Sequence, residues 1–308
     1  MVRKFLSTED TTSLKGLAIL LIILSHIGDG GFHHRIFVPL GGFGVAIFLI
    51  LSGYGLMESY KKHGLENFFK KRLLRILIPY VLWVMTFIVI MLCLHQRILL
   101  SSIRYWFVEY IFLWYIVFFF ALKHAYQYRW PLFCIVAIIS FWILPCLQAQ
   151  QSLSFLIGIA ISERKSQLVH IQRRKLFQIA ALLVVVGILA FAAKQWLAMH
   201  ISSVPTSDIL VVHNVDDDDQ LRKFVQIITK CPIAIAIIII MTQTKARLLK
   251  FNYLGLIAYE LYLVHMPFYG LINCNYYYLL FFLLFISITS VVLGRCNRKI
   301  TSYILDSW

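Results

Sequence analysis

The sequence predicts an all-α, polytopic membrane protein: a bundle of about ten transmembrane helices with the N and C termini in the cytoplasm. Hydrophobic residues make up 60% of the 308 residues and the mean hydropathy is +0.80, whereas soluble domains are roughly 45–50% apolar. Apolar runs of about 17 to 25 residues, the length that crosses a hydrocarbon core, recur along the chain. Basic residues gather in alternate loops between these runs. We therefore expect one transmembrane domain over residues 1–308, with no appended soluble domain.

The apolar runs, taken in chain order, set the predicted spans. Helices are expected because an open sheet leaves its edge groups unpaired in lipid, and the runs are too long and too uniformly apolar for barrel strands. The first and the sixth runs are short. The predicted spans cover residues 14–28, 38–59, 74–94, 104–122, 130–147, 151–162, 176–197, 223–243, 251–271 and 276–296.

The first span follows Arg3 and Lys4 and has the short apolar stretch of a signal peptide. No A-x-A-like cleavage site follows it, and SHIGDGG at residues 25–31 stands in its place. We therefore expect this span to be retained. It carries Lys15 near its start and His26 near its end, eleven residues apart, which puts the two within about 20° of one helix face and about 16 Å apart. A single histidine on an apolar helix is usually a packing residue, but an ionisable partner on the same face favours a functional site.

The second span is rich in small residues. These let helix backbones approach closely, and they also leave room for a ligand or a locally unwound helix beside a cavity. Both interpretations stay open. The small residues are Gly41, Gly42, Gly44, Ser52, Gly53 and Gly55.

The third span begins with the basic stretch KKRLLR at residues 70–75. Arg72 and Arg75 are three residues apart and so share one helical face. Two guanidinium groups on one face suit phosphate, which each can bind through two hydrogen bonds. Positive charge at the cytoplasmic end of a span is also an ordinary orientation signal.

The remaining polar residues of the spans lie in the fourth, eighth and ninth runs. Glu109 is placed just inside the outer boundary, where it could face a polar substrate. Lys230 and Glu260 both come out near the middle of the membrane, so we expect a structural salt bridge between them. His265 is either a core histidine or a second polar wall of a cavity.

Charge placement orients the chain. The formal net charge is +15, and the cations concentrate in the loops after even-numbered spans, while the longest odd-numbered loop, residues 198–221, carries DDDD at 216–219. By the positive-inside rule, the even loops and both termini face the cytoplasm. These clusters are loop-sized and form no continuous basic stripe, which argues against nucleic acid as a partner.

The six cysteines are scattered at residues 93, 134, 146, 231, 274 and 296, with no metal-ligand spacing. We expect no bound metal. His33 and His34 are expected to be solvated in an external loop.

Three features together resemble the membrane acyltransferase-3 family, bacterial enzymes that O-acylate carbohydrates of the cell surface. They are the basic residue and histidine of the first span (Lys15 and His26), the glycine-rich span leading to SGY at 52–54, and the R-x-x-R pair Arg72 and Arg75. Softer matches are WFV at 106–108, FLIG at 155–158 and YLVH at 262–265. The chain departs from the family in having Thr12 where an aspartate is common and Lys15 where an arginine is common.

The resemblance implies an O-acyltransferase of the bacterial cytoplasmic (inner) membrane that uses acetyl-CoA as a donor substrate, with no permanently bound cofactor. Its partners would be membrane lipid, acyl-CoA and a carbohydrate acceptor. In this interpretation His26 is the general base or a transient acyl carrier, and Lys15, Arg72 and Arg75 hold the donor phosphates. The substrate-binding candidates are Glu109, Trp106, Ser52 and His265.

Some alternatives stay open. The acyl group is acetyl or succinyl, and the transfer is direct or passes through an acyl-histidine. A transporter or flippase of lipid-linked sugars would also use many spans and buried charges. A third possibility is a structural partner in polysaccharide assembly.

Overall fold

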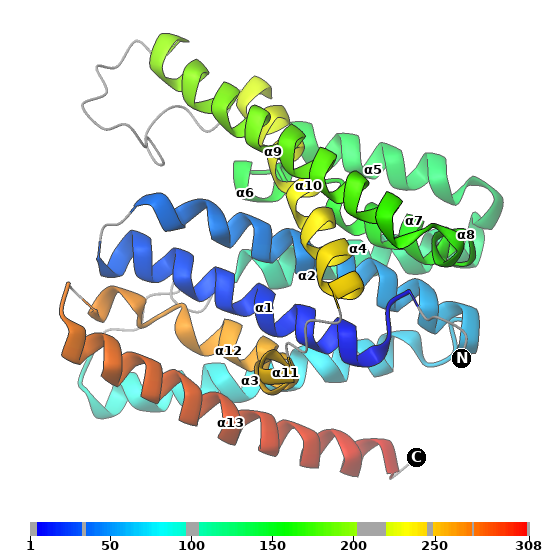
Figure 1. Ribbon diagram of the computed structural model, residues 1–308. Helices are drawn as coiled ribbons and strands as arrows, with labels where there is room; N and C mark the ends of the chain where they lie inside the picture. Colours follow the sequence, from blue (N-terminus) through cyan, green and yellow to red (C-terminus); the bar gives the residue numbers. More distant parts are fainter. Residues whose placement is uncertain are drawn as a thin grey trace.

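The computed structural model describes residues 5–32, 35–96, 105–201, 220–244, 249–272 and 274–306, and in these the regular elements are all helices (Figure 1). The all-α prediction is confirmed. The acidic run at 216–219, His33 and His34 lie outside the described residues. The α-helices are α1 (Thr8–His26), α2 (Val38–His63), α3 (Phe68–Cys93), α4 (Trp106–His124), α5 (Arg129–Ile143), α6 (Cys146–Ala149), α7 (Ser154–Glu163), α8 (Lys165–His170), α9 (Arg173–Ile201), α10 (Gln220–Thr244), α11 (Leu249–Leu256), α12 (Ala258–His265) and α13 (Tyr276–Asp306).

Seven helices of the described chain are long and apolar enough to cross a membrane: α1 to α4, α9, α10 and α13. The other three predicted spans fall on shorter helices. Residues 130–147 contain the 15-residue α5, and residues 151–162 contain the 10-residue α7. Residues 251–271 are divided between α11 and α12, of 8 residues each, with a break at Ile257. The structure thus shows seven candidate spans, and ten spans remains a prediction.

The first helix begins six residues earlier than its apolar run because it has its own start signal. Ser7 caps α1: its side chain accepts a hydrogen bond from the Asp10 amide at 3.1 Å, and Asp10 accepts one from the Ser7 amide at 2.9 Å. This reciprocal pair is the capping box that favours a helix start. It adds two polar turns before Lys15, which therefore lies inside the helix.

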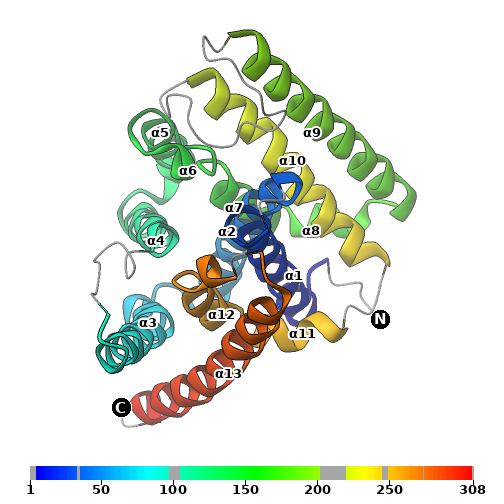
Figure 2. The same cartoon turned by 90° about the vertical axis from the view of Figure 1, so that its left-hand side faces the viewer.

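Helix α2 lies between α1 and α7 at the centre of the bundle (Figure 2). A Cβ at Gly44 would meet the Ala18 carbonyl of α1 at 2.5 Å. On another face, a Cβ at Gly53 would overlap the Phe155 carbonyl of α7. Helix α2 is continuous through its glycines, so at these positions the small residues serve close packing.

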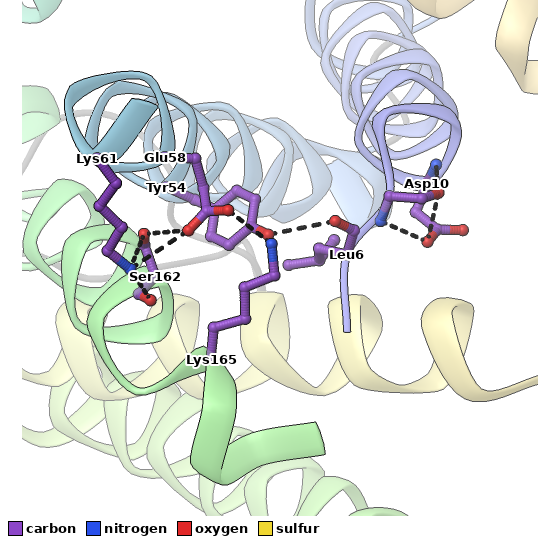
Figure 3. A network of polar contacts seen from close by, with 8 residues as sticks. Leu6, Asp10, Tyr54, Glu58, Lys61, Ser162 and Lys165 are labelled. Atoms are coloured by element: carbon purple, nitrogen blue, oxygen red, sulfur yellow. Dashed lines mark hydrogen bonds and ion pairs between the residues drawn. The ribbon is translucent and has the colours of Figure 1, made fainter. Parts of the chain in front are cut away.

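Polar contacts fasten one end of this central group (Figure 3). Glu58 of α2 accepts hydrogen bonds from Ser162 Oγ at 2.7 Å and from Lys165 Nζ at 2.6 Å, on α7 and α8. Tyr54 donates to the Leu6 carbonyl at 3.2 Å. Partial burial of Lys165 favours its neutral form, but the hydrogen bonds and electrostatic attraction to Glu58 and Tyr54 together outweigh this and raise the pKa of the ammonium. The contacts tie α2, α7, α8 and the segment before α1 together.

The start of α1 and the end of α13 lie at the same end of the bundle (Figure 1). The α2–α3 turn and helix α8 lie at this end as well, and both are flanked by lysine or arginine residues. This arrangement is compatible with the predicted topology. That this end lies in the cytoplasm stays a prediction.

Candidate active site

Two cavities lie along α1, and Tyr262 of α12 lines both of them. The first, of about 330 Å³, is lined by Lys15, Arg72 and Arg75 and is called the cationic cavity. The second, of about 370 Å³, is lined by His26 and is called the His26 cavity. Because Lys15 lies towards the start of α1 and His26 is its last residue, the two cavities occupy opposite halves of that helix.

The cations of the cationic cavity come from two helices. Lys15 belongs to α1, while Arg72 and Arg75 belong to the first turns of α3 and share a face. Both arginines repel the Lys15 ammonium electrostatically. Three like charges that line one space in a bundle favour an anionic ligand between them. Ser52, a predicted substrate contact, also lines this cavity.

One carboxylate, that of Glu260, is among the residues that line the cationic cavity. Its Oε1 accepts a hydrogen bond from Asn297 Nδ2 of α13 at 3.1 Å, and Arg298 lies near it. Glu260 is therefore hydrogen-bonded to α13. One carboxylate cannot neutralise three cations, so the cavity keeps a net positive charge.

His26 lies where α1 changes its winding. The α-helix ends at His26, and a π-helical turn, Ile27–Gly31, follows it directly. Such wide turns are rare and occur frequently at functional sites. Next to it, Ser25 donates to the Val38 carbonyl at 2.7 Å, which ties the end of α1 to the start of α2. This bond fixes the backbone that carries the imidazole.

Aromatic rings surround the His26 imidazole on one side. Its ring centroid lies 5.2 Å from that of His265 and 4.9 Å from that of Tyr269. His265 is fully buried, its Nδ1 is 2.9 Å from the Leu261 carbonyl, and it is not among the residues that line either cavity. Of the two interpretations left open by the sequence, the structure favours a core histidine that packs behind His26.

The boundary between the cavities is aromatic. The Tyr262 ring lies 5.2 Å from that of Phe107, which lines the cationic cavity, whereas the adjacent Trp106 lines the His26 cavity. Tyr105 supports this wall: its hydroxyl donates to the Leu263 carbonyl at 2.7 Å and accepts from Trp83 Nε1 at 2.8 Å. The start of α4 and the middle of α12 therefore separate the two spaces.

One prediction from the sequence is corrected. The expected salt bridge between Lys230 and Glu260 is wrong, because Lys230 lines the His26 cavity and donates to Gln150 Oε1, whereas Glu260 lines the other cavity and accepts from Asn297. Glu109 is exposed and lines neither cavity, and its role as a substrate contact stays a prediction. Counting residues inward gives depth but not the direction a side chain takes.

Sequence reasoning missed seven polar residues of the His26 cavity: Ser25, Asp29, Gln150, Gln151, Lys194, Gln226 and Thr229. Gln150 and Gln151 had a visible signal, since the polar run QAQQS at 148–152 interrupts two apolar runs. Asp29 lines this cavity three residues after His26, in the π-helical turn. Lys194 had no signal beyond being a cation near the end of a span.

A family model described as an acyltransferase domain matches residues 12–296. Searches of the curated proteins and of the solved structures give no match. The matched range includes both cavities and every residue that lines them.

Proposed function

Because the chain belongs to the membrane acyltransferase-3 family, as its motifs predicted, we propose that it moves an acetyl group from cytoplasmic acetyl-CoA to a hydroxyl of a cell-surface or lipid-linked carbohydrate. Membership of the family, together with seven apolar helices, identifies a membrane acyltransferase. The donor, the acceptor, the bacterial cytoplasmic membrane and the residue roles that follow belong to the proposal.

The observation that carries the proposal is the pair of cavities that share Tyr262 in their walls. A cationic space suits the phosphates of a coenzyme A donor, and a separate space with an imidazole suits a hydroxyl acceptor. Their positions on opposite halves of α1 allow the two substrates to enter from opposite faces of the membrane. Only the acyl group then needs to pass the wall between them.

The donor headgroup would bind in the cationic cavity. Arg72 and Arg75 each offer a planar set of donors that matches phosphate oxygens, while Lys15 adds a point charge from α1. The thin pantetheine arm would extend along Ile111 and Phe107, which also line this cavity, towards Tyr262. This directs the thioester to the wall beyond which His26 lies.

His26 would act as the base. Its imidazole takes the proton of the acceptor hydroxyl as the oxygen attacks the thioester carbonyl, an ester forms and the carbon–sulfur bond breaks. The imidazolium then returns the proton to the departing thiolate, so that charge and atoms balance. In the alternative order, His26 itself first carries the acetyl group and then passes it to the hydroxyl.

The test is the acetyl content of surface glycans in cells that make the intact protein or the His26→Ala variant. We expect His26→Ala to remove the acetyl groups contributed by this protein, while expression and thermal stability remain close to those of the parent. His170→Ala, an exposed histidine on α8, is the matched control and should acetylate normally. Unchanged acetylation by His26→Ala would refute the proposed role.

A transporter or flippase is the second proposal, since two cavities in line are also what a translocation route requires. It is distinguished by its product. A transporter would move labelled lipid-linked sugar across the membrane with no acetyl label incorporated into it.

A further inference from the structure

Two lysines of the His26 cavity are not explained by base catalysis. Lys230 of α10 is only 7% exposed, and its Nζ donates to Gln150 Oε1. A glutamine oxygen carries no charge and cannot neutralise an ammonium group. In the part of the chain that the structure describes, no carboxylate forms an ion pair with Lys230. A buried cation in a membrane is costly unless a partner compensates it.

The position of Lys230 is built by its neighbours. A Cβ at Gly42 of α2 would collide with the Lys230 side chain, so the glycine leaves the space that the lysine stem occupies. Gln151 Nε2 donates to the Gly42 carbonyl at 3.0 Å and so holds this part of α2. The ammonium is therefore set into the wall of the cavity and has little freedom to reach bulk water.

Lys194 of α9 lines the same cavity, and helices α9 and α10 run side by side (Figures 1 and 2). The two ammonium groups lie close enough to repel each other. Two cations from adjacent helices that face one cavity form a site whose natural occupant carries negative charge.

The other residues that line the cavity indicate which further chemical groups its ligand has. Gln150, Gln226 and Thr229 line the cavity with neutral polar groups, and Trp106 adds an aromatic surface. Amides and hydroxyls form hydrogen bonds with sugar hydroxyls. Asp29 is the one carboxylate among the lining residues, and one carboxylate cannot compensate two ammonium groups. An acidic carbohydrate matches both features, whereas a neutral sugar would leave a net positive charge in the cavity.

We propose that Lys230 and Lys194 form an anion subsite that selects an acceptor carbohydrate bearing a carboxylate or phosphate group. This inference rests on the proposed function and names the class of its acceptor. The subsite lies in the same cavity as His26, so an anionic group held there positions a hydroxyl of the same glycan for acetylation.

The test uses the full-length protein in nanodiscs, radiolabelled acetyl-CoA, and glycans from the cell surface separated by anion exchange into neutral and acidic pools. The acidic pool is also assayed after reduction of its carboxyl groups and after removal of its phosphates. We expect label in the acidic pool and its loss after one of these treatments, which identifies the anion.

Equal labelling of the neutral pool, or label that resists both treatments, would overturn the anion subsite and leave the acetyltransferase proposal standing. No label in any pool would contradict the acetyltransferase proposal itself, and the subsite with it. Efficient labelling of neutral glycans from succinyl-CoA alone would instead show that the lysines bind a charged acyl group.

Two variants localise the effect. Lys230→Gln and Lys194→Gln should each raise KM for the acidic acceptor about tenfold, the effect of one charged hydrogen bond, with KM for acetyl-CoA unchanged. Lys194 is only partly buried, so Lys194→Gln remains informative if Lys230→Gln folds poorly. Lys123→Gln, an exposed lysine at the end of α4, is the control and should keep the parent constants. Parent values in both cavity variants would exclude the subsite.

Discussion

The charged side chains are the residues whose positions say most about this protein. Lys15 lines the same cavity as Arg72 and Arg75 although it is far from both in sequence. The sequence predicted that Lys15 shares a helix face with His26, and Arg72 with Arg75, because helical periodicity is local. That α1 and α3 bring both faces to one cavity depends on packing between helices, which spacing along a single helix does not contain.

The two arginines give a prediction about the donor. We expect Arg72→Ala and Arg75→Ala each to raise KM for acetyl-CoA about tenfold or more, because each loses charged hydrogen bonds to phosphate. The rate at saturating donor should change little, since neither residue lies in the His26 cavity. Steady-state kinetics in nanodiscs measures both constants.

Lys62→Ala is the control for charge loss at the same end of the bundle, because Lys62 is exposed on the last turn of α2 and lines neither cavity. It should keep the parent KM. Parent affinity for coenzyme A in both arginine variants would show that the headgroup binds elsewhere.

Prediction at the residue scale was weakest where a side chain has a choice of directions. Lys230 and Glu260 were expected at one depth, yet they line different cavities and bond to Gln150 and Asn297 instead. The break at Ile257 separates α11 from α12. A residue count that assumes one continuous helix therefore gives the wrong direction for the Glu260 side chain. Its partner Asn297 is on a helix that the sequence treated only as an apolar run.

The helices themselves were more predictable than their ends. Apolar runs located α2, α3, α4, α9, α10 and α13 because a span must be long and apolar to satisfy its backbone in lipid. Short helices and breaks were not resolved by hydropathy. Helix α5 ends at Ile143, where the backbone becomes extended at Leu144 before Pro145, and no hydropathy window detects such a turn.

The contact between α2 and α7 gives a prediction at the scale of elements. A Cβ at Gly158 would overlap the Ile50 carbonyl, which is backbone and cannot move aside cheaply. We expect Gly158→Ala to force the helices apart and to destabilise the protein by about 1 to 3 kcal/mol or more. Thermal unfolding in detergent, followed by a fluorescent thiol probe or by light scattering, measures the loss.

Gly55→Ala on α2 is the matched control, because no atom beyond the adjoining backbone of its own helix lies within 4 Å of a Cβ there. Alanine is the better helix former by roughly 1 kcal/mol, so the control should be neutral or slightly stabilising. Equal melting temperatures for Gly158→Ala and the parent would mean that α2 and α7 are further apart in the protein than in the structure.

At the scale of the whole molecule, the important feature is the separation of two cavities by a thin aromatic wall. The sequence supplied the residues on both sides, Lys15 and His26, and their approximate distance along one helix. It did not supply the wall, since Tyr262 and Phe107 come from α12 and α4 and meet only through packing. Motifs thus predicted which polar residues of α1 and α3 line the cavities, but not the shape of the site.

In the proposed mechanism, donor and acceptor approach from opposite faces of the membrane. Sealed vesicles of known orientation test this arrangement, with acceptor glycan trapped inside and radiolabelled acetyl-CoA, which does not cross lipid, added outside. We predict that inside-out vesicles, which expose the end that carries Lys15, Arg72 and Arg75, label the trapped glycan, whereas right-side-out vesicles do not. Labelling in right-side-out vesicles, or labelling only when donor and acceptor share one side, would contradict entry from opposite faces.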